Sequence, residues 1–229
     1  MYTILKSKIF YGLVLLVPAY TWSRFFKIWK RLRKKLKDRE LFYSRHNCVV
    51  MYDNNRRVTG WPTTLKSIDK RFGVYDPLLY FIYTAQKSLD VAMMVISNTT
   101  IANALIKVHK RGIAIRIILD HDCSRNSSSK DLEKSGIPIL YYVCPEQSIP
   151  SIMHYKFIVK DHSSNCGFVY IGSQNWSTVA FQGYYENTVF TTNRSVAKVI
   201  HKCFEDTWSY VDKLCKTDPY VKAKLKGVQ

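Results

Sequence analysis

The sequence predicts an α/β sandwich with a central mixed β-sheet flanked by helices, preceded by an apolar N-terminal helix. Two observations support this. From Pro62 onward, β-type runs alternate with runs of helical periodicity. Upstream, the fourteen residues from Ile9 to Trp22 carry no charge and are mostly apolar. A hydrophobic content of 47% and an aromatic content of 14% indicate a folded globule.

The apolar run at the N-terminus is shorter than the ~20 residues that a membrane span needs. The side chains of Arg24 and Lys27 can snorkel toward the membrane interface, which extends the apolar zone as far as Trp29. We therefore expect a short tail over 1–8 and a single-pass membrane anchor over 9–29. A signal peptide and a soluble amphipathic helix are the alternatives, although no convincing cleavage site follows the run.

A basic block follows the apolar run. The stretch from Arg24 to Arg39 has nine basic residues and one acidic residue, and its apolar positions have helical spacing. We expect a juxtamembrane helix over 30–40 that is attracted to anionic lipid. The positive-inside rule places this block, and the domain after it, in the cytosol. Of the net charge of +18, residues 40–229 carry +8, which favours a polyanionic partner.

The predicted main domain covers 41–212 and begins with a strand-like run and a loop over 41–61. Gly112 and Gly136 are expected to end two of its helices, and Thr99 or Thr100 to cap one. The lysine-rich residues 213–229 are expected to be frayed. The expected helices are 77–85, 99–111, 127–135 and 194–211. The expected strands are 88–97, 113–119, 137–143, the run that carries His154 and Lys156, 168–171 and 186–191.

One candidate motif has the spacing H-x-K-x4-D and consists of His154, Lys156 and Asp161. Since His154 and Lys156 lie two apart on a β-type run, both side chains should leave the same face of the strand. A lysine neutralises phosphate oxygens, and a histidine can attack phosphorus or move a proton. A protonated lysine repels a metal ion and cannot ligate it, so we expect no metal at this site.

A second motif, G-S-x-N, follows the strand-like run 168–171 and consists of Gly172, Ser173 and Asn175. An incidental histidine and lysine on a strand would explain the first motif alone. The second motif so close downstream makes coincidence a poor explanation.

Together the two motifs resemble the phospholipase D superfamily. The single catalytic motif and the apolar, basic leader resemble its mitochondrial cardiolipin hydrolase/Zucchini branch, and the resemblance covers 41–212. It implies a phospholipase D-like sandwich, a phosphohistidine intermediate, a second histidine as acid and base, and no cofactor. Because the sequence has one H-x-K, we expect a homodimer in which His154 of both copies completes one shared active site.

The resemblance also implies roles for the remaining motif residues. Lys156 and Asn175 bind the non-bridging oxygens, and Ser173 adds a hydroxyl donor. Glu186 accepts the other imidazole N–H, with an ordinary exposed glutamate as the alternative. Asp161 belongs to the catalytic motif but lies on the opposite strand face by parity, so we expect a structural role for it. The ten residues between Asp161 and Gly172 are more than the family usually has, and we expect them to enlarge a hairpin loop.

Two other histidines need an interpretation. His121 follows a predicted strand and either lines the groove or is an ordinary loop histidine. Relatives often carry a small Cys/His zinc module near His46 and Cys48, but two ligands do not make a structural zinc site. We expect this module to be absent or degenerate. Six cysteines without a C-x-x-C indicate free thiols in a reducing compartment, and disulfides are the alternative because the number is even.

We interpret the chain as a membrane-anchored endoribonuclease that cleaves single-stranded RNA in piRNA precursor processing, as the resemblance implies. Its expected place is the mitochondrial outer membrane with the domain facing the cytosol, and its expected partners are RNA, anionic membrane lipid and piRNA-pathway proteins. One alternative is a cardiolipin hydrolase that produces phosphatidic acid; another is a non-catalytic membrane-tethered scaffold for RNA-processing proteins. Nearby aromatic residues either stack on bases or belong to the core: Tyr155, Trp176, Phe181, Tyr184 and Tyr185.

Overall fold

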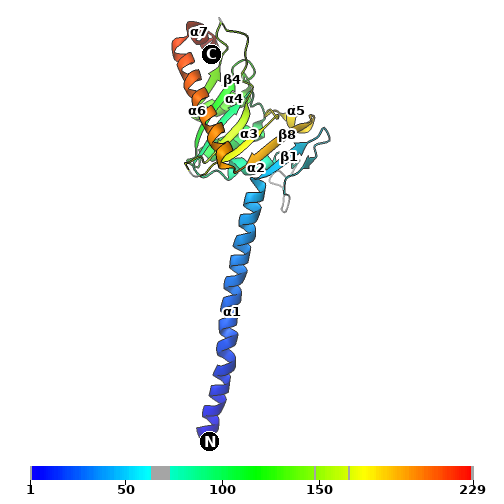
Figure 1. The fold of residues 1–229 in the computed structure, drawn as a ribbon, viewed down its shortest axis with the longest axis vertical. Coiled ribbons are helices and arrows are strands. Elements are labelled where there is room, and N and C mark those ends of the chain that lie inside the picture. Colours follow the sequence, from blue (N-terminus) through cyan, green and yellow to red (C-terminus); the bar gives the residue numbers. More distant parts are fainter. Residues whose placement is uncertain (1, 63–72, 147, 165, 228–229) are drawn as a thin grey trace. The chain divides into compact units, whose positions relative to one another are not determined.

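The computed structural model describes residues 2–62, 73–146, 148–164 and 166–227, and the side chains from residue 18 onward (Figure 1). The chain divides into two compact units, 1–43 and 44–229. The first unit is most of helix α1 (Tyr2–Arg45). Leu41–Arg45 is therefore helical, and the predicted strand-like run over 41–61 is wrong for these five residues because the helical pattern of the basic block continues through them.

The predicted anchor, 9–29, lies within the helix α1. Its residues 9–17 precede the part of the chain where side chains are described. In the part of the chain where side chains are described, no helix combines the length and the apolar character that a membrane crossing requires. The exposed side chains of the described part include Trp22, Phe25 and Trp29 together with the lysines and arginines of the basic block.

The second unit contains one mixed sheet of eight strands in the order β2-β1-β8-β7-β6-β3-β4-β5. Strands β3, β4 and β5 run parallel to one another, and the remaining neighbours are antiparallel. This confirms the predicted α/β class with a mixed sheet. The strands are β1 (Cys48–Tyr52), β2 (Val58–Thr59), β3 (Ser88–Met93), β4 (Ala114–Asp120), β5 (Ile139–Tyr142), β6 (Lys156–Lys160), β7 (Phe168–Gly172) and β8 (Glu186–Thr191).

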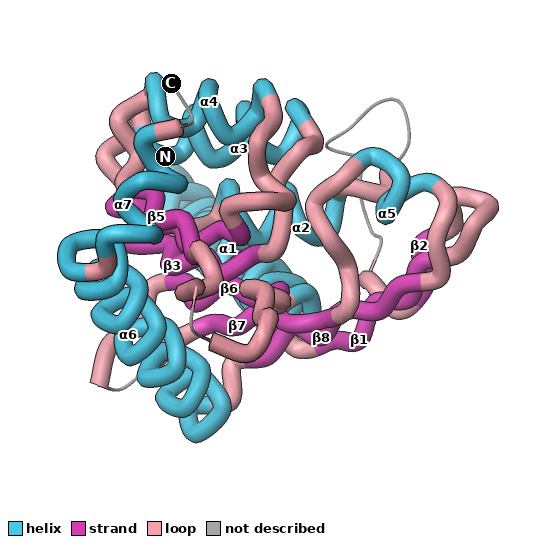
Figure 2. The backbone as a smooth tube through the Cα atoms, turned by 90° about the horizontal axis from the view of Figure 1, so that it is seen from above, coloured by secondary structure: helices cyan, strands magenta, loops and turns pink. Residues whose placement is uncertain are grey.

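Helices cover both faces of the sheet, as Figure 2 shows. One core joins the sheet to α2, α3 and α4, and a second core joins the other face to α6. Each face of the central strands is therefore apolar, which explains why the strands read as continuous hydrophobic runs. The helices of this unit are α2 (Asp76–Tyr83), α3 (Thr99–His109), α4 (Ser127–Lys134), α5 (Thr178–Gln182), α6 (Arg194–Thr217) and α7 (Pro219–Lys226).

The helix ends differ from prediction in two places. Asn98, and neither Thr99 nor Thr100, caps α3 by accepting a hydrogen bond from the backbone N–H of Ile101. The predicted frayed tail is wrong, because α6 continues to Thr217 and α7 follows it. Val221 of α7 is fully buried and packs in a small third core. The expected stops at Gly112 and Gly136 are confirmed by their positive φ angles of 89° and 84°.

Candidate functional site

The predicted site residues other than Asp161 lie at one edge of the sheet, where β6 and β8 begin and β3 and β7 end. The register fixes this arrangement: Lys156 pairs with Met93 of β3, and Gly172 pairs with Thr188 of β8. The H-x-K and G-S-x-N motifs, which are separated along the chain, thus lie at adjacent strand ends.

His154 lies two residues before β6 begins, so the prediction that it belongs to the strand is wrong. The segment nevertheless continues beside β3, because the backbone N–H of Met94 donates to the Tyr155 carbonyl (3.0 Å). The His154 side chain is exposed and makes no hydrogen bond with any described residue. An imidazole on a paired backbone but open to solvent is available to a substrate.

Lys156 is the first residue of β6, and only 7% of it is exposed. Its Nζ donates to the carbonyl of His154 (3.0 Å), which ties the two motif residues together. Burial lowers the pKa of Lys156, while the negative charge of Glu186 and the Cys123 thiol act in the opposite direction. A cation that is partly desolvated interacts more strongly with a phosphate than one in bulk water.

Ser173 and Glu186 form a pair beside Lys156. The Ser173 hydroxyl donates to Glu186 Oε2 and accepts from the backbone N–H of Asn187 (3.1 Å). The single hydroxyl proton of Ser173 is thus directed at Glu186, which holds this carboxylate in place. The predicted contact between Glu186 and the His154 imidazole is not among the interactions of the described residues.

Gly172 has a steric reason to be glycine. A Cβ at this position would lie 2.1 Å from the Asn187 carbonyl oxygen and 2.8 Å from Thr188 Cα. Both atoms belong to the backbone of β8, which cannot move without breaking the pairing. The glycine of G-S-x-N therefore lets β7 and β8 approach closely and brings Ser173 to Glu186.

Asn175 lies in a segment that pairs with the backbone just after β3. Trp176 pairs with Ile96, and its N–H donates to the Val95 carbonyl (3.2 Å). The Asn175 Oδ1 atom is buried and accepts no hydrogen bond from the described residues. The position at the sheet edge agrees with the predicted grip on a phosphate oxygen, and that role remains a proposal.

Asp161 lies at the other end of β6 from Lys156, roughly 16 Å away at the rise of an extended strand. Its carboxylate accepts hydrogen bonds from the backbone N–H groups of Gln86, Lys87 and Ser88, at 2.6 to 3.0 Å. Its φ of 51° is a left-handed conformation that aspartate tolerates better than most residues. This geometry fits the structural role inferred from strand parity and keeps Asp161 away from the chemistry.

Asp120 is a positioning residue that the sequence did not reveal. It is buried at the end of β4, and Oδ2 accepts the backbone N–H of Met153 (3.0 Å) while Oδ1 accepts those of Asp122 and Cys123. It thereby fixes the backbone immediately before His154. A buried aspartate at the carboxyl end of a hydrophobic strand was the available signal.

Other candidates lie elsewhere. His121 is buried between Asp122 and Arg125 and lines a separate cavity of about 300 Å³. His46 is fully buried against Lys160. Among the aromatic candidates, Trp176 and Phe181 are core residues, whereas the exposed ones are Tyr155, Tyr184 and Tyr185.

The comparison with protein families places residues 78–208 in a model described as "Cardiolipin synthase, PLD-like domain". The chain is 31% identical over 140 residues to the mitochondrial cardiolipin hydrolase of Xenopus laevis, covering 60% of this chain and 62% of that protein. It is 28% identical over 186 residues to the Xenopus tropicalis protein of the same name, covering 80% and 81%. It is 29% identical over 133 residues to the human protein of that name, covering 57% of this chain and 49% of that protein. The match thus spans less than two thirds of two of these three relatives.

Two solved structures share the fold. Nuc from Salmonella typhimurium, described as a phospholipase D family member, has a TM-score of 0.50 and 25% identity, covering 58% of this chain and 84% of that chain. NucT from Helicobacter pylori has a TM-score of 0.52 and 23% identity, covering 59% and 87%.

Proposed function

This chain belongs to the phospholipase D superfamily, and we propose that it is a phosphodiesterase that cleaves single-stranded RNA through a phosphohistidine intermediate. The observation that carries the proposal is the sheet edge itself. An exposed imidazole, a partly desolvated ammonium, a fixed carboxylate and an amide meet there, at His154, Lys156, Glu186 and Asn175. This combination suits the attack on a phosphodiester and the stabilisation of a five-coordinate phosphorus.

The proposed reaction needs two imidazoles and takes the second from another copy of the chain. His154 attacks phosphorus, which forms a P–N bond and breaks the P–O bond to the leaving oxygen. The partner subunit's His154 donates a proton to that oxygen. It then takes a proton from water, which attacks phosphorus, breaks the P–N bond and releases the product. Lys156 and Asn175 bind the non-bridging oxygens throughout.

RNA is favoured as substrate by the charge. Residues 40–229 carry a net charge of +8, and phosphate contacts dominate the affinity of nucleic-acid binding. Exposed tyrosines at the same edge of the sheet, Tyr155, Tyr184 and Tyr185, offer faces to unpaired bases. In this proposal the cellular substrate is a piRNA precursor.

The second candidate substrate is cardiolipin, which would yield phosphatidic acid. Three curated relatives from frogs and human are named mitochondrial cardiolipin hydrolase, and this name favours the lipid. The same sheet edge would perform the same displacement on either phosphodiester.

The experiment that tests both candidates uses the full chain on a single-stranded RNA and on cardiolipin vesicles. We expect RNA cleavage that persists in excess chelator, because the Lys156 ammonium neutralises charge on the phosphate without a metal and the Asn175 amide donates a hydrogen bond to it. His154→Asn should lower it by roughly a thousandfold or more. The matched control is His162→Asn, at the opposite end of the β6–β7 hairpin, and it should stay active. Activity confined to cardiolipin would reverse the substrate assignment, and metal-dependent cleavage would contradict the phosphohistidine.

For the cellular location, we propose a single-pass anchor over 9–29 in the mitochondrial outer membrane, with the domain in the cytosol. The uncharged run from Ile9 to Trp22, the basic block after it and the word "mitochondrial" in the relatives' names support this. Protease added to intact mitochondria should digest the domain. Protection that lasts until the outer membrane is ruptured would disprove the orientation.

A further inference from the structure

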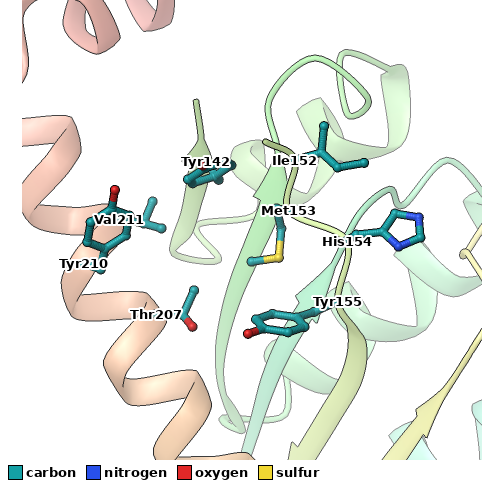
Figure 3. Close-up of a pocket in the computed structure, with 8 residues that line it drawn as sticks. All are labelled: Tyr142, Ile152, Met153, His154, Tyr155, Thr207, Tyr210 and Val211. Atoms are coloured by element: carbon teal, nitrogen blue, oxygen red, sulfur yellow. The ribbon is translucent and has the colours of Figure 1, made fainter. Parts of the chain in front are cut away.

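A cavity of about 490 Å³ lies directly beside His154, between the segment that precedes β6 and the helix α6 (Figure 3). The lining on one side comes from β5 and the segment, with Tyr142, Ile152, Met153, His154 and Tyr155, and on the other side from α6, with Thr207, Tyr210 and Val211. Of these side chains the proposed reaction uses only His154.

The cavity combines flat apolar surface with hydroxyl groups. Tyr155 is 45% exposed and Tyr210 is 52% exposed, so both rings are open to a ligand, while Met153 is buried at 5%. Tyr142, Thr207 and the two exposed tyrosines each place a hydroxyl in or near the lining. The Tyr142 hydroxyl bonds to Ser151 (2.5 Å), so that wall is fixed. Aromatic faces with hydroxyl groups at their edges suit a nucleobase, which has a flat face and a polar rim.

An acyl chain fits this lining less well. The Tyr142 and Thr207 hydroxyls already bond to Ser151 and to the Cys203 carbonyl (2.7 Å), so they do not choose between a base and a hydrocarbon. The exposed rings of Tyr155 and Tyr210 offer flat faces on which a nucleobase can stack. These two rings favour a base over the acyl chain of a lipid.

The position of the cavity relative to His154 indicates which nucleotide of a bound RNA strand would place its base there. Figure 3 shows the imidazole of His154 and the ring of Tyr155 on opposite sides of the same backbone segment. The two residues are consecutive, so a phosphate at the imidazole and a group in the cavity are separated by one backbone segment. The part of an RNA strand nearest to this cavity, when a phosphate lies at His154, is the nucleotide next to that phosphate.

We propose that this cavity binds the nucleobase adjacent to the scissile phosphodiester, with Tyr155 and Tyr210 as stacking surfaces; the proposal rests on the proposed function as an RNA phosphodiesterase. Stacking on a tyrosine face tolerates all four bases, so the cavity recognises the presence of a base and not its identity. Its contribution is to hold an unpaired strand with the phosphate at His154. A base-paired nucleotide cannot turn its face into the cavity, so the cavity selects single strands.

The test uses full-length protein and a series of single-stranded RNAs, each with one abasic nucleotide at a different position. Cleavage should be suppressed at the phosphodiester next to the abasic nucleotide and unchanged elsewhere on the same strand, which serves as an internal control. Tyr210→Ala should raise KM on normal RNA roughly 5- to 100-fold and abolish the abasic effect. Tyr210→Phe keeps the ring and should behave nearly as the wild type. Val199→Ala is a matched control, since Val199 is 65% exposed on the same helix and outside the cavity.

The outcomes separate the two proposals. Wild-type cleavage that ignores the abasic position, together with an unchanged KM for Tyr210→Ala, overturns the base subsite and leaves RNA cleavage intact. A loss of cardiolipin hydrolysis and not of RNA cleavage in Tyr210→Ala would make the occupant an acyl chain. If sedimentation shows that the Tyr210→Ala variant is a monomer, the tyrosine lies at a subunit interface. This result, like a selective loss of cardiolipin hydrolysis, overturns the base subsite. If the wild type cleaves no RNA at all, the proposed function fails and this inference fails with it.

Discussion

At the scale of single residues, β6 places two buried lysines on the same face, one at each end of the strand. Lys156 reaches the sheet edge, whereas Lys160 is fully buried, with Nζ 2.8 Å from Thr84 Oγ1, 3.2 Å from the Phe81 carbonyl and 2.5 Å from His46 Nε2. Burial lowers the pKa of Lys160 to about 7, and Asp161 opposes that shift. The first lysine is proposed to bind the substrate, and the second imposes a cost on folding.

This cost predicts a pH dependence of stability. The unfolded chain holds the Lys160 proton up to its ordinary pKa of 10.5, and the folded chain loses it near pH 7. Between these values the unfolded state binds more protons, so the free energy of unfolding rises with pH, by at most about 1.4 kcal/mol per pH unit. Lys160→Met removes this contribution. Urea unfolding between pH 7.5 and 9.5 should give a steeper rise for the wild type than for the variant; parallel curves would show that Lys160 does not titrate in this range.

The sequence predicts candidate site residues that are linked by local spacing, and it misses residues that act through contacts between distant segments. His154, Lys156, Ser173 and Asn175 stand out because their separations are short and fixed. The bond from Asp120 to the Met153 N–H, and the contact of Lys160 with His46, join segments that are far apart in the sequence. Hydrophobic periodicity assigns each such residue to an element but does not show which partner the fold brings to it.

At the scale of elements, α7 shows how composition misled the prediction for the C-terminal segment. Many lysines suggested a frayed tail, but Asp218 caps the helix by accepting the N–H of Val221 (3.1 Å), with Pro219 in its first turn. Val221 and Leu225 are four residues apart and face the same neighbours in the third core. The aspartate–proline start and this apolar spacing were the signals, and the lysines occupy the solvent side.

The docking of α7 is open to test by core truncation. Val221→Ala removes two methyl groups from a fully buried position, and we expect it to lower the free energy of unfolding by roughly 1–3 kcal/mol. Val199→Ala removes the same atoms from an exposed position on α6 and should change stability by less than about 0.5 kcal/mol. Chemical denaturation of both variants measures the difference. Equal, small effects would mean that α7 does not pack against the domain in solution.

At the scale of the whole molecule, the prediction concerns the shared site. If each site needs His154 from both subunits, a mixed dimer of wild type and His154→Asn contains no complete pair of imidazoles. RNA cleavage should then fall as the square of the wild-type fraction: at one quarter wild type, roughly one sixteenth of the activity remains. Subunit exchange is confirmed separately with two affinity tags. A linear decrease would show that each subunit is self-contained, and His121 would be the first residue to mutate in the search for an internal acid.

The β6–β7 hairpin has the chemistry at one end and its connecting loop at the other. Lys156 begins β6 at the proposed substrate edge, and Asp161 directly follows β6, where three backbone amides near the start of β3 bind its carboxylate. The number of residues between Lys156 and Asp161 is thus fixed by the length of one strand. The interval from Asp161 to Gly172 runs around the far loop, where added residues displace nothing at the site. A profile used to search genomes for relatives should therefore hold the first interval rigid and allow gaps in the second.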